Sequence, residues 1–111
     1  MTPMENRRLT PRFTLMSPMT YRATAASGQG LLVSLSETGC TLEADIAFAL
    51  RDPVTLLFRL GLAEPVVAIA TVRWTQGTRS GAEFVCMSAG CQERLREWVG
   101  SRAYGQDCEQ R

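Results

Sequence analysis

Two arginines spaced four residues apart near the start of the chain, in Arg8-Leu-Thr-Pro-Arg12, are its most distinctive candidate for binding chemistry. A second candidate, Ser34-Leu-Ser-Glu-Thr-Gly39, places two serines and a glycine directly after an apolar run. Guanidinium groups bond bidentately to phosphate oxygens and to the O6/N7 edge of guanine, and they also stack on bases. A guanine nucleotide offers all of these surfaces, so the two segments together indicate a site for such an anion.

The balance of charge limits the class of partner. The formal net charge is +1, which disfavours a general polyanion binder because such proteins usually carry a strongly basic face. All 12 positive residues are arginine. Three of them, Arg7, Arg8 and Arg12, cluster near the start with only Glu5 opposing them, so positive charge is concentrated where the anion site is predicted.

The residue types also bear on metal binding and catalysis. Histidine is absent and the cysteines form no CxxC pair, so neither a zinc site nor another metal site is expected. The sequence has no histidine, no cysteine with a candidate base beside it and no carboxylate pair at a suggestive spacing. No enzymatic activity is therefore expected. The cysteines are interpreted as small core residues, with Cys108 in a polar tail as the most exposed. The four are Cys40, Cys86, Cys91 and Cys108.

Length and hydropathy favour one small cytoplasmic domain. The chain has 111 residues, enough for a single modest core. No apolar stretch approaches the roughly 20 residues that cross a bilayer, so membrane insertion is not expected. The first residues contain several charges and no apolar block, unlike a secretory signal.

The middle of the chain predicts a series of β-strands. Residues 1–12 are polar, contain two prolines and indicate an arm, whereas residues 13–25 suit an edge strand bent at Pro18. Residues 27–30 are a turn signal, and residues 39–45 alternate apolar and polar side chains as a half-buried strand does. Further strands are expected over 54–62, 66–74 and 81–87, with a short helical turn possible over 47–51. Closely spaced strands separated by Gly and Pro indicate an antiparallel sandwich or barrel.

The last element is predicted to be an amphipathic helix. Ser88 is a candidate N-cap, and Gly100 marks the expected end of the helix. Such a helix could close one end of a barrel, with residues 104–111 following as a flexible tail. The apolar residues at helical spacing are Cys91, Leu95, Trp98 and Val99.

Taken together, these segments resemble the PilZ family, bacterial receptor domains for the second messenger cyclic di-GMP. The family carries an RxxxR motif in an N-terminal arm and (D/N)xSxxG at a later strand turn. Residues 8–12 match the first motif, with Arg7 as the common doubled arginine, and residues 34–39 match the second except at Ser34. Two later strands also fit the family pattern: Val72-Arg73-Trp74 and Gly81-Ala82-Glu83-Phe84.

The resemblance implies a mainly β fold, a six-stranded antiparallel barrel with a C-terminal α-helix over residues 13–103. It implies a cyclic di-GMP-binding receptor or adaptor that signals to an unidentified effector protein, with motility, biofilm or polysaccharide output. No cofactor, DNA or RNA is expected. A PilZ-like adaptor that does not bind the nucleotide, as in type IV pilus assembly, is the alternative. A single-stranded nucleic acid binder would need more stacking aromatics than the 7% present.

The family pattern also implies the ligand contacts. Arg8 and Arg12 are expected to engage the phosphates and the Hoogsteen edges of the guanines. Each contact has a structural alternative: a solvated basic arm for the arginines, a hairpin in which Ser36 caps the turn and Gly39 supplies positive φ, or a core position for Trp74. The full set of predicted ligand-binding residues is Arg7, Arg8, Arg12, Ser34, Ser36, Gly39 and Trp74.

Ser34 is the one departure from the motif. An Asp there can accept from both N1–H and N2–H₂ of guanine, whereas a serine hydroxyl makes only one short bond. Losing one good hydrogen bond costs on the order of 1 kcal/mol. We therefore expect Ser34 to weaken ligand binding and not to alter its kind.

Overall fold

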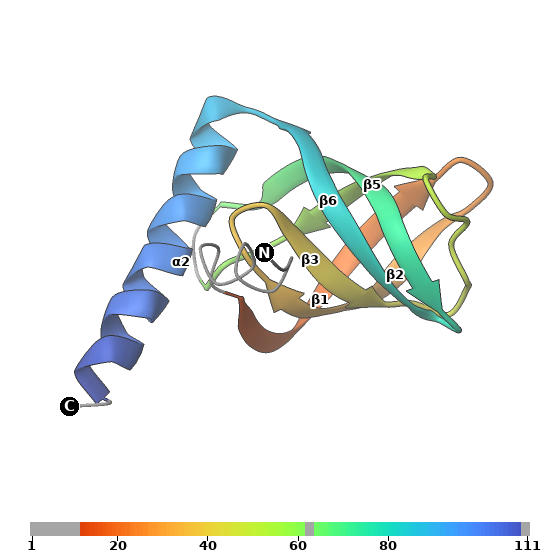
Figure 1. Cartoon of the computed structure of the whole chain (residues 1–111). Helices are drawn as coiled ribbons and strands as arrows, with labels where there is room; N and C mark the ends of the chain where they lie inside the picture. Colours follow the sequence, from red (N-terminus) through yellow and green to blue (C-terminus); the bar gives the residue numbers. More distant parts are fainter. Residues whose placement is uncertain (1–11, 62–63, 110–111) are drawn as a thin grey trace, which may run out of the picture.

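The computed structural model describes residues 12–61 and 64–109, with side chains described up to Arg102. Within these residues the chain forms six strands followed by one helix (Figure 1). In order along the chain these are β1 (Phe13–Ala23), β2 (Ser27–Leu35), β3 (Gly39–Glu43), β4 (Pro53–Phe58), β5 (Val66–Gln76), β6 (Arg79–Met87) and α2 (Ala89–Glu109).

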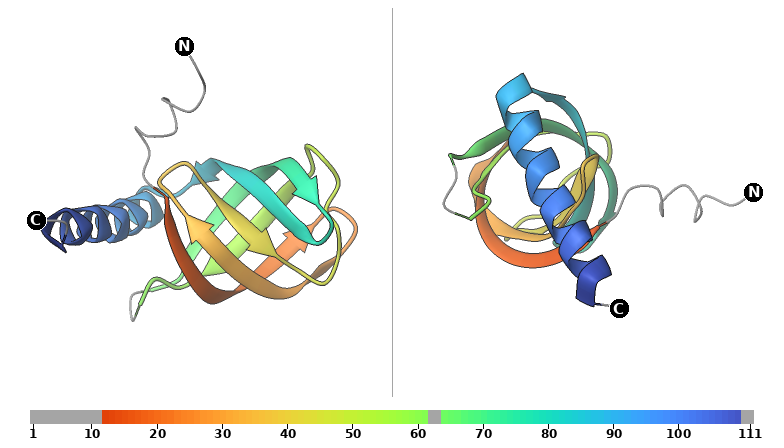
Figure 2. Two further views of the ribbon diagram at one scale, coloured as in Figure 1. Left: turned by 60° about the horizontal axis from the view of Figure 1, so that its bottom comes forward. Right: turned by 90° about the vertical axis from the view of Figure 1, so that its left-hand side faces the viewer.

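The strands close into a barrel in which each strand pairs antiparallel with two neighbours (Figure 2). The order around the barrel is β1-β2-β3-β6-β5-β4, and pairing of residues 19–23 with residues 54–58 completes the ring. The predicted six-stranded antiparallel barrel with a C-terminal helix is therefore confirmed.

β1 is not the edge strand that its proline suggested. It pairs with β2 along most of its length and with β4 from Met19 onward. Pro18 lies just before the pairing with β4 begins, where β1 has only one neighbour. The missing N–H of a proline is tolerated at such a position because no ladder bond is required on the open side.

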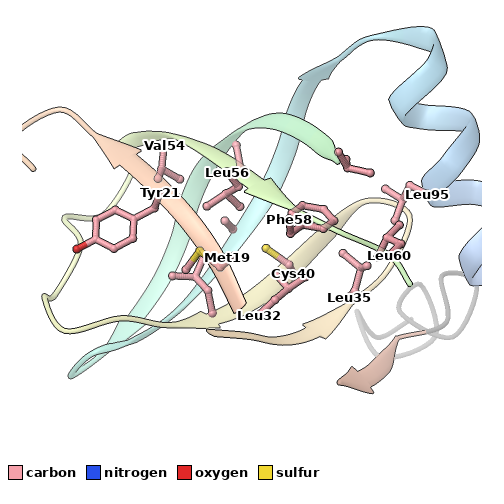
Figure 3. Packing of buried hydrophobic residues seen from close by; sticks show 14 of the residues in the cluster. Met19, Tyr21, Leu32, Leu35, Cys40, Val54, Leu56, Phe58, Leu60 and Leu95 are labelled. Atoms are coloured by element: carbon pink, nitrogen blue, oxygen red, sulfur yellow. The ribbon is translucent and has the colours of Figure 1, made fainter. Parts of the chain in front are cut away.

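Alternate residues of the strands point into the barrel and form its hydrophobic core. In β4, Val54, Leu56 and Phe58 are buried, and Figure 3 shows them packed with side chains from the other strands. Burying such a side chain contributes about 1.5–3 kcal/mol. Toward one end of the core the Tyr21 hydroxyl donates to Asp45 Oδ1 at 3.0 Å, which satisfies the one polar atom of this buried ring.

Two local predictions, the turn over residues 27–30 and the short helical turn over residues 47–51, were wrong. In both segments, backbone pairing with residues distant in sequence overrides the local preference. Residues 27–30 belong to β2, and the turn precedes them. Gly30 is required there because a Cβ would overlap the Glu43 carbonyl oxygen of β3. Residues 47–51 form no helix: Arg51 has a φ of 69° and donates its backbone N–H to the Val72 carbonyl at 2.8 Å.

Helix α2 crosses one open end of the barrel (Figure 2). The predicted N-cap is confirmed, since Ser88 Oγ accepts from the Cys91 backbone N–H at 3.1 Å. Trp98 meets Phe13 edge to face, with ring centroids 6.3 Å apart. The predicted end at Gly100 was wrong, because this glycine keeps a helical backbone without the positive φ of a C-cap and the helix continues to Glu109. The flexible tail over 104–111 stays a prediction.

The cysteines divide into two environments. Cys40 and Cys91 are buried, as expected of small core residues, whereas Cys86 is exposed and that part of the prediction was wrong. The side chain of Cys108 lies outside the described side chains. Over residues 12–61 and 64–109, no helix is long and apolar enough to cross a membrane.

Candidate functional site

Arg12 and Ser34, which are 22 residues apart in the sequence, meet in the structure. The Arg12 guanidinium Nη1 donates to Ser34 Oγ and to Thr41 Oγ1, both at 3.2 Å. Strand register explains this contact, since Ser34 pairs with Thr14 of β1 on one side and with Thr41 of β3 on the other. The side chain of Arg12, the second arginine of the RxxxR motif, therefore contacts the first residue of the serine motif at the end of β2. Arg7 and Arg8 lie outside the described residues.

Ser36 is committed to the turn between β2 and β3. Its side chain is 1% exposed, and its Oγ accepts from the backbone N–H groups of Thr38 and Gly39, each at 3.2 Å. The same hydroxyl donates to the Gly39 carbonyl at 3.3 Å. The interpretation of Ser36 as the cap of an ordinary turn is thereby confirmed.

Gly39 is needed for close packing and not for its backbone angle. Its φ lies outside the left-handed region, so the expected positive φ was wrong. A Cβ at this position would instead overlap the carbonyl oxygen of Ala82, with which β6 approaches β3. The glycine therefore holds the serine turn against β6.

A hollow of about 240 Å³ lies beside this turn, and it contains several of the predicted site residues. Trp74 forms part of its wall and is 42% exposed, so the alternative that Trp74 is a core residue was wrong. The hollow is lined by Arg12, Thr38, Gly39, Cys40, Arg73, Trp74, Gly81, Ala82 and Glu83. Ser34 does not line it and is 8% exposed beneath Arg12.

Arg73 and Glu83 line the hollow but were not predicted as site residues. Arg73 Nε donates to Glu83 Oε1 at 2.6 Å across the β5–β6 pair. A register shift between Val72 and Trp74 interrupts the regular pairing at Arg73. The sequence did contain a signal, because both residues lie within the strand segments that fit the family pattern, but only the barrel brings them to the hollow.

The charges of the lining suit an anion. Arg12 and Arg73 supply two guanidinium groups, and Glu83 is the single carboxylate among the described residues of the lining. Burial raises the pKa of the Cys40 thiol to about 12, against a smaller opposing effect of Arg12, so Cys40 offers no thiolate nucleophile at neutral pH. No group of metal-ligating side chains occurs among the described residues. The hollow can therefore bind a phosphate through guanidinium groups and a flat ring against Trp74.

The described chain is thus a small antiparallel barrel with a helix across one end and a hollow with two arginines beside a serine turn. The model of the PilZ domain family matches residues 6–101, and the chain belongs to that family. The resemblance seen in the sequence is thus confirmed. The comparison with curated proteins finds no match.

Two solved structures share the fold. One is the Bacillus subtilis inhibitor of motility (MotI/DgrA), with a TM-score of 0.76 and 17% identity over 89% of this chain. The match covers 52% of that protein, so the present chain spans about half its length. The other is the PilZ domain of CeSA from a cellulose synthesizing bacterium, with a TM-score of 0.66 and 13% identity over 84% of this chain and 98% of that domain.

Proposed function

We propose that the chain is a cyclic di-GMP receptor that binds the nucleotide at the hollow beside Trp74 and signals to a partner protein. The observation that carries this proposal is the position of Arg12. Its guanidinium lines a cationic hollow together with Arg73 and an exposed tryptophan ring. Phosphates and guanine bases are the groups that such a combination recognises.

Each lining group has a distinct role in this proposal. Arg12 contacts a phosphate or the Hoogsteen edge of a guanine, and Trp74 stacks on a base, which is worth about 1–3 kcal/mol. The hollow is smaller than the roughly 300–1,000 Å³ of typical ligand pockets. The remaining cover over the ligand comes from the arm that carries Arg7 and Arg8. Ser34 acts through Arg12, because its hydroxyl accepts from that guanidinium.

The signal is a change of surface. When the arm closes over the ligand, the protein presents a different face, and a partner responds only if its affinity differs between the two states. The chain acts in the cytoplasm as a binding protein without catalytic activity. Motility, biofilm formation or polysaccharide production is the output, and the name of the Bacillus subtilis inhibitor of motility is consistent with an adaptor role.

Isothermal titration with cyclic di-GMP tests the proposal. The wild-type chain should bind, and Arg12→Ala should lower the affinity by about tenfold or more, a loss of about 1.4 kcal/mol or more. Arg22→Ala is the matched control, since it removes an equal charge from an exposed position of β1 that does not line the hollow. The proposal would be excluded if titration with tens of micromolar cyclic di-GMP gave no heat of binding.

A second candidate function is an adaptor that works without the nucleotide. Both serines of the motif favour it, because Ser36 is fully used by its turn and Ser34 is covered by Arg12. In this conformation the Ser36 hydroxyl is used within the turn, and the buried Ser34 hydroxyl accepts from Arg12. Arg8→Ala and Arg12→Ala separate the two functions: a cellular phenotype that survives both changes would favour the adaptor.

A further inference from the structure

The outer surface of β4 and β5 carries apolar side chains where a barrel normally presents polar ones. Leu57, Val67 and Ile69 are 42%, 43% and 43% exposed. Leu57 pairs directly with Val67 across the two strands, and Ile69 follows on the same side of β5. We call these three residues the outer patch. Exposed apolar patches are common features of protein interaction surfaces.

The surface beside the outer patch is hollowed. A depression of about 500 Å³ contains Leu57 and Val67, and a second of about 280 Å³ adjoins it and also contains Leu57. Both also include Thr20 of β1 and Gln29 of β2, so they form one groove across β2, β1, β4 and β5. This groove has more volume than the hollow beside Trp74.

Among the residues that the structure describes, the charged side chains that line the groove are arginines. Arg22 lines the larger depression and Arg59 lines the smaller one, and no described Asp or Glu lines either. An occupant with apolar side chains and carboxylates would therefore match both the outer patch and its rim.

The same charges disfavour two other occupants. Two copies of this chain joined through this face would bring only arginines together at the charged positions, because a two-fold interface pairs a surface with itself. The chain's own arm contains Arg7, Arg8 and Arg12 against Glu5 alone, so it is also mismatched in charge. The occupant that matches the charge of the groove is therefore a separate protein with an acidic surface.

The closed barrel decides the form of this partner segment. At the outer patch β4 pairs with β1 and β5, and β5 pairs with β4 and β6, so no strand edge is open to an added β-strand. An extended peptide lying on an apolar face would leave its backbone polar groups without partners, whereas a helix satisfies its own. We propose that this groove docks an acidic amphipathic helix of a partner protein.

The position of the groove fits an adaptor. Residues 67, 69 and 73 lie at alternate positions of β5, so this single strand carries the outer patch near one end and Arg73, at the ligand hollow, near the other. Four residues of strand span about 13 Å from Ile69 to Arg73. A helix docked on the outer patch thus lies on the same strand as a residue of the ligand hollow.

A helical-peptide display library, with acidic, basic and apolar residues allowed at all surface positions, provides the test on the full chain. Selected peptides should be acidic with apolar residues at i, i+3 and i+4 spacing. In fluorescence anisotropy, Leu57→Thr and Arg22→Glu should each weaken binding by about tenfold or more. Met16→Thr is the control, since Met16 is exposed but lines neither depression, and it should bind as the wild type does.

Several results would overturn the proposal. These are the absence of any enriched peptide, enrichment of basic peptides, or equal binding to Leu57→Thr, Arg22→Glu and the wild type. Concentration-dependent self-association that Leu57→Thr abolishes would assign the groove to a second copy instead. Thermal unfolding of each variant establishes that a loss of binding is not a loss of fold, and Val67→Thr provides an independent substitution, since Val67 lines the larger depression.

Discussion

The indole of Trp74 lies over Gly81, its cross-strand partner, in the space that a side chain at position 81 would occupy. A Cβ at Gly81 would overlap the indole nitrogen itself. The glycine therefore lets a large aromatic ring lie flat on the barrel while a substantial part of it stays exposed at the ligand hollow.

Replacing Trp74 should reduce ligand binding more than stability. Trp74→Ala removes a stacking surface worth about 1–3 kcal/mol, so the affinity for cyclic di-GMP in isothermal titration should fall by roughly fivefold to a hundredfold. Binding should also quench the fluorescence of Trp74. Trp98→Phe is the control, because Trp98 packs on Phe13 and should contribute no quenching. Quenching that disappears in Trp98→Phe and persists in Trp74→Ala would place the ligand elsewhere.

Restoring the family residue at position 34 should strengthen binding. Once Arg12, which covers position 34, turns toward the ligand, Ser34→Asp supplies a carboxylate that can accept two hydrogen bonds from guanine, and an affinity gain of severalfold to about a hundredfold is expected. Parallel titrations of the wild type and the variant measure it. Weaker binding would contradict this prediction. It would mean that the new carboxylate pairs with Arg12, whose Nη1 lies 3.2 Å from the serine hydroxyl, and holds its guanidinium away from the phosphate.

Glu83 is expected to restrain the arginine that it contacts. Glu83→Gln should free Arg73 for a phosphate and raise the affinity by about 1.4-fold to fivefold, because exposed ion pairs are worth about 0.2–1 kcal/mol. Glu43→Gln is a matched control, since Glu43 also pairs with an exposed arginine, Arg79, but does not line the hollow. If both variants gained affinity equally at the same ionic strength, the gain would come from the change in net charge and not from the release of Arg73.

Gly39 should be intolerant of even the smallest side chain. Gly39→Ala places a methyl group against the Ala82 carbonyl oxygen, so β3 and β6 must move apart. We expect the free energy of unfolding in urea to fall by about 1–3 kcal/mol. Gly100→Ala is the comparison, because Gly100 lies in helix α2 with open space around it and alanine there should stabilise by about 0.5–1 kcal/mol. Unchanged stability in Gly39→Ala would contradict the packing argument.

Local patterns in the sequence were sufficient for much of the fold. The alternation over residues 39–45 predicted β3, and the apolar spacing after Ser88 predicted a helix with the N-cap that the structure contains. Both signals arise within one element, where side-chain period and backbone hydrogen bonding are set by neighbours in the chain. The order and spacing of the two motifs, together with the β-rich middle and the terminal helix, were likewise enough to indicate the family.

The amino-acid sequence by itself determined the strand pattern, the capped helix and the two polar motifs, because each depends on residues close together in the chain. Only the tertiary structure decided that the strand containing Pro18 pairs with two neighbouring strands from Met19 onward. It also decided that Arg73 and Arg12 line the same hollow. It also decided that Trp74 is exposed beside Gly81 and that Leu57 meets Val67 on an outer surface. These contacts depend on strand register and barrel closure, which bring together residues from different strands. No local pattern in the sequence indicates which of these residues will meet.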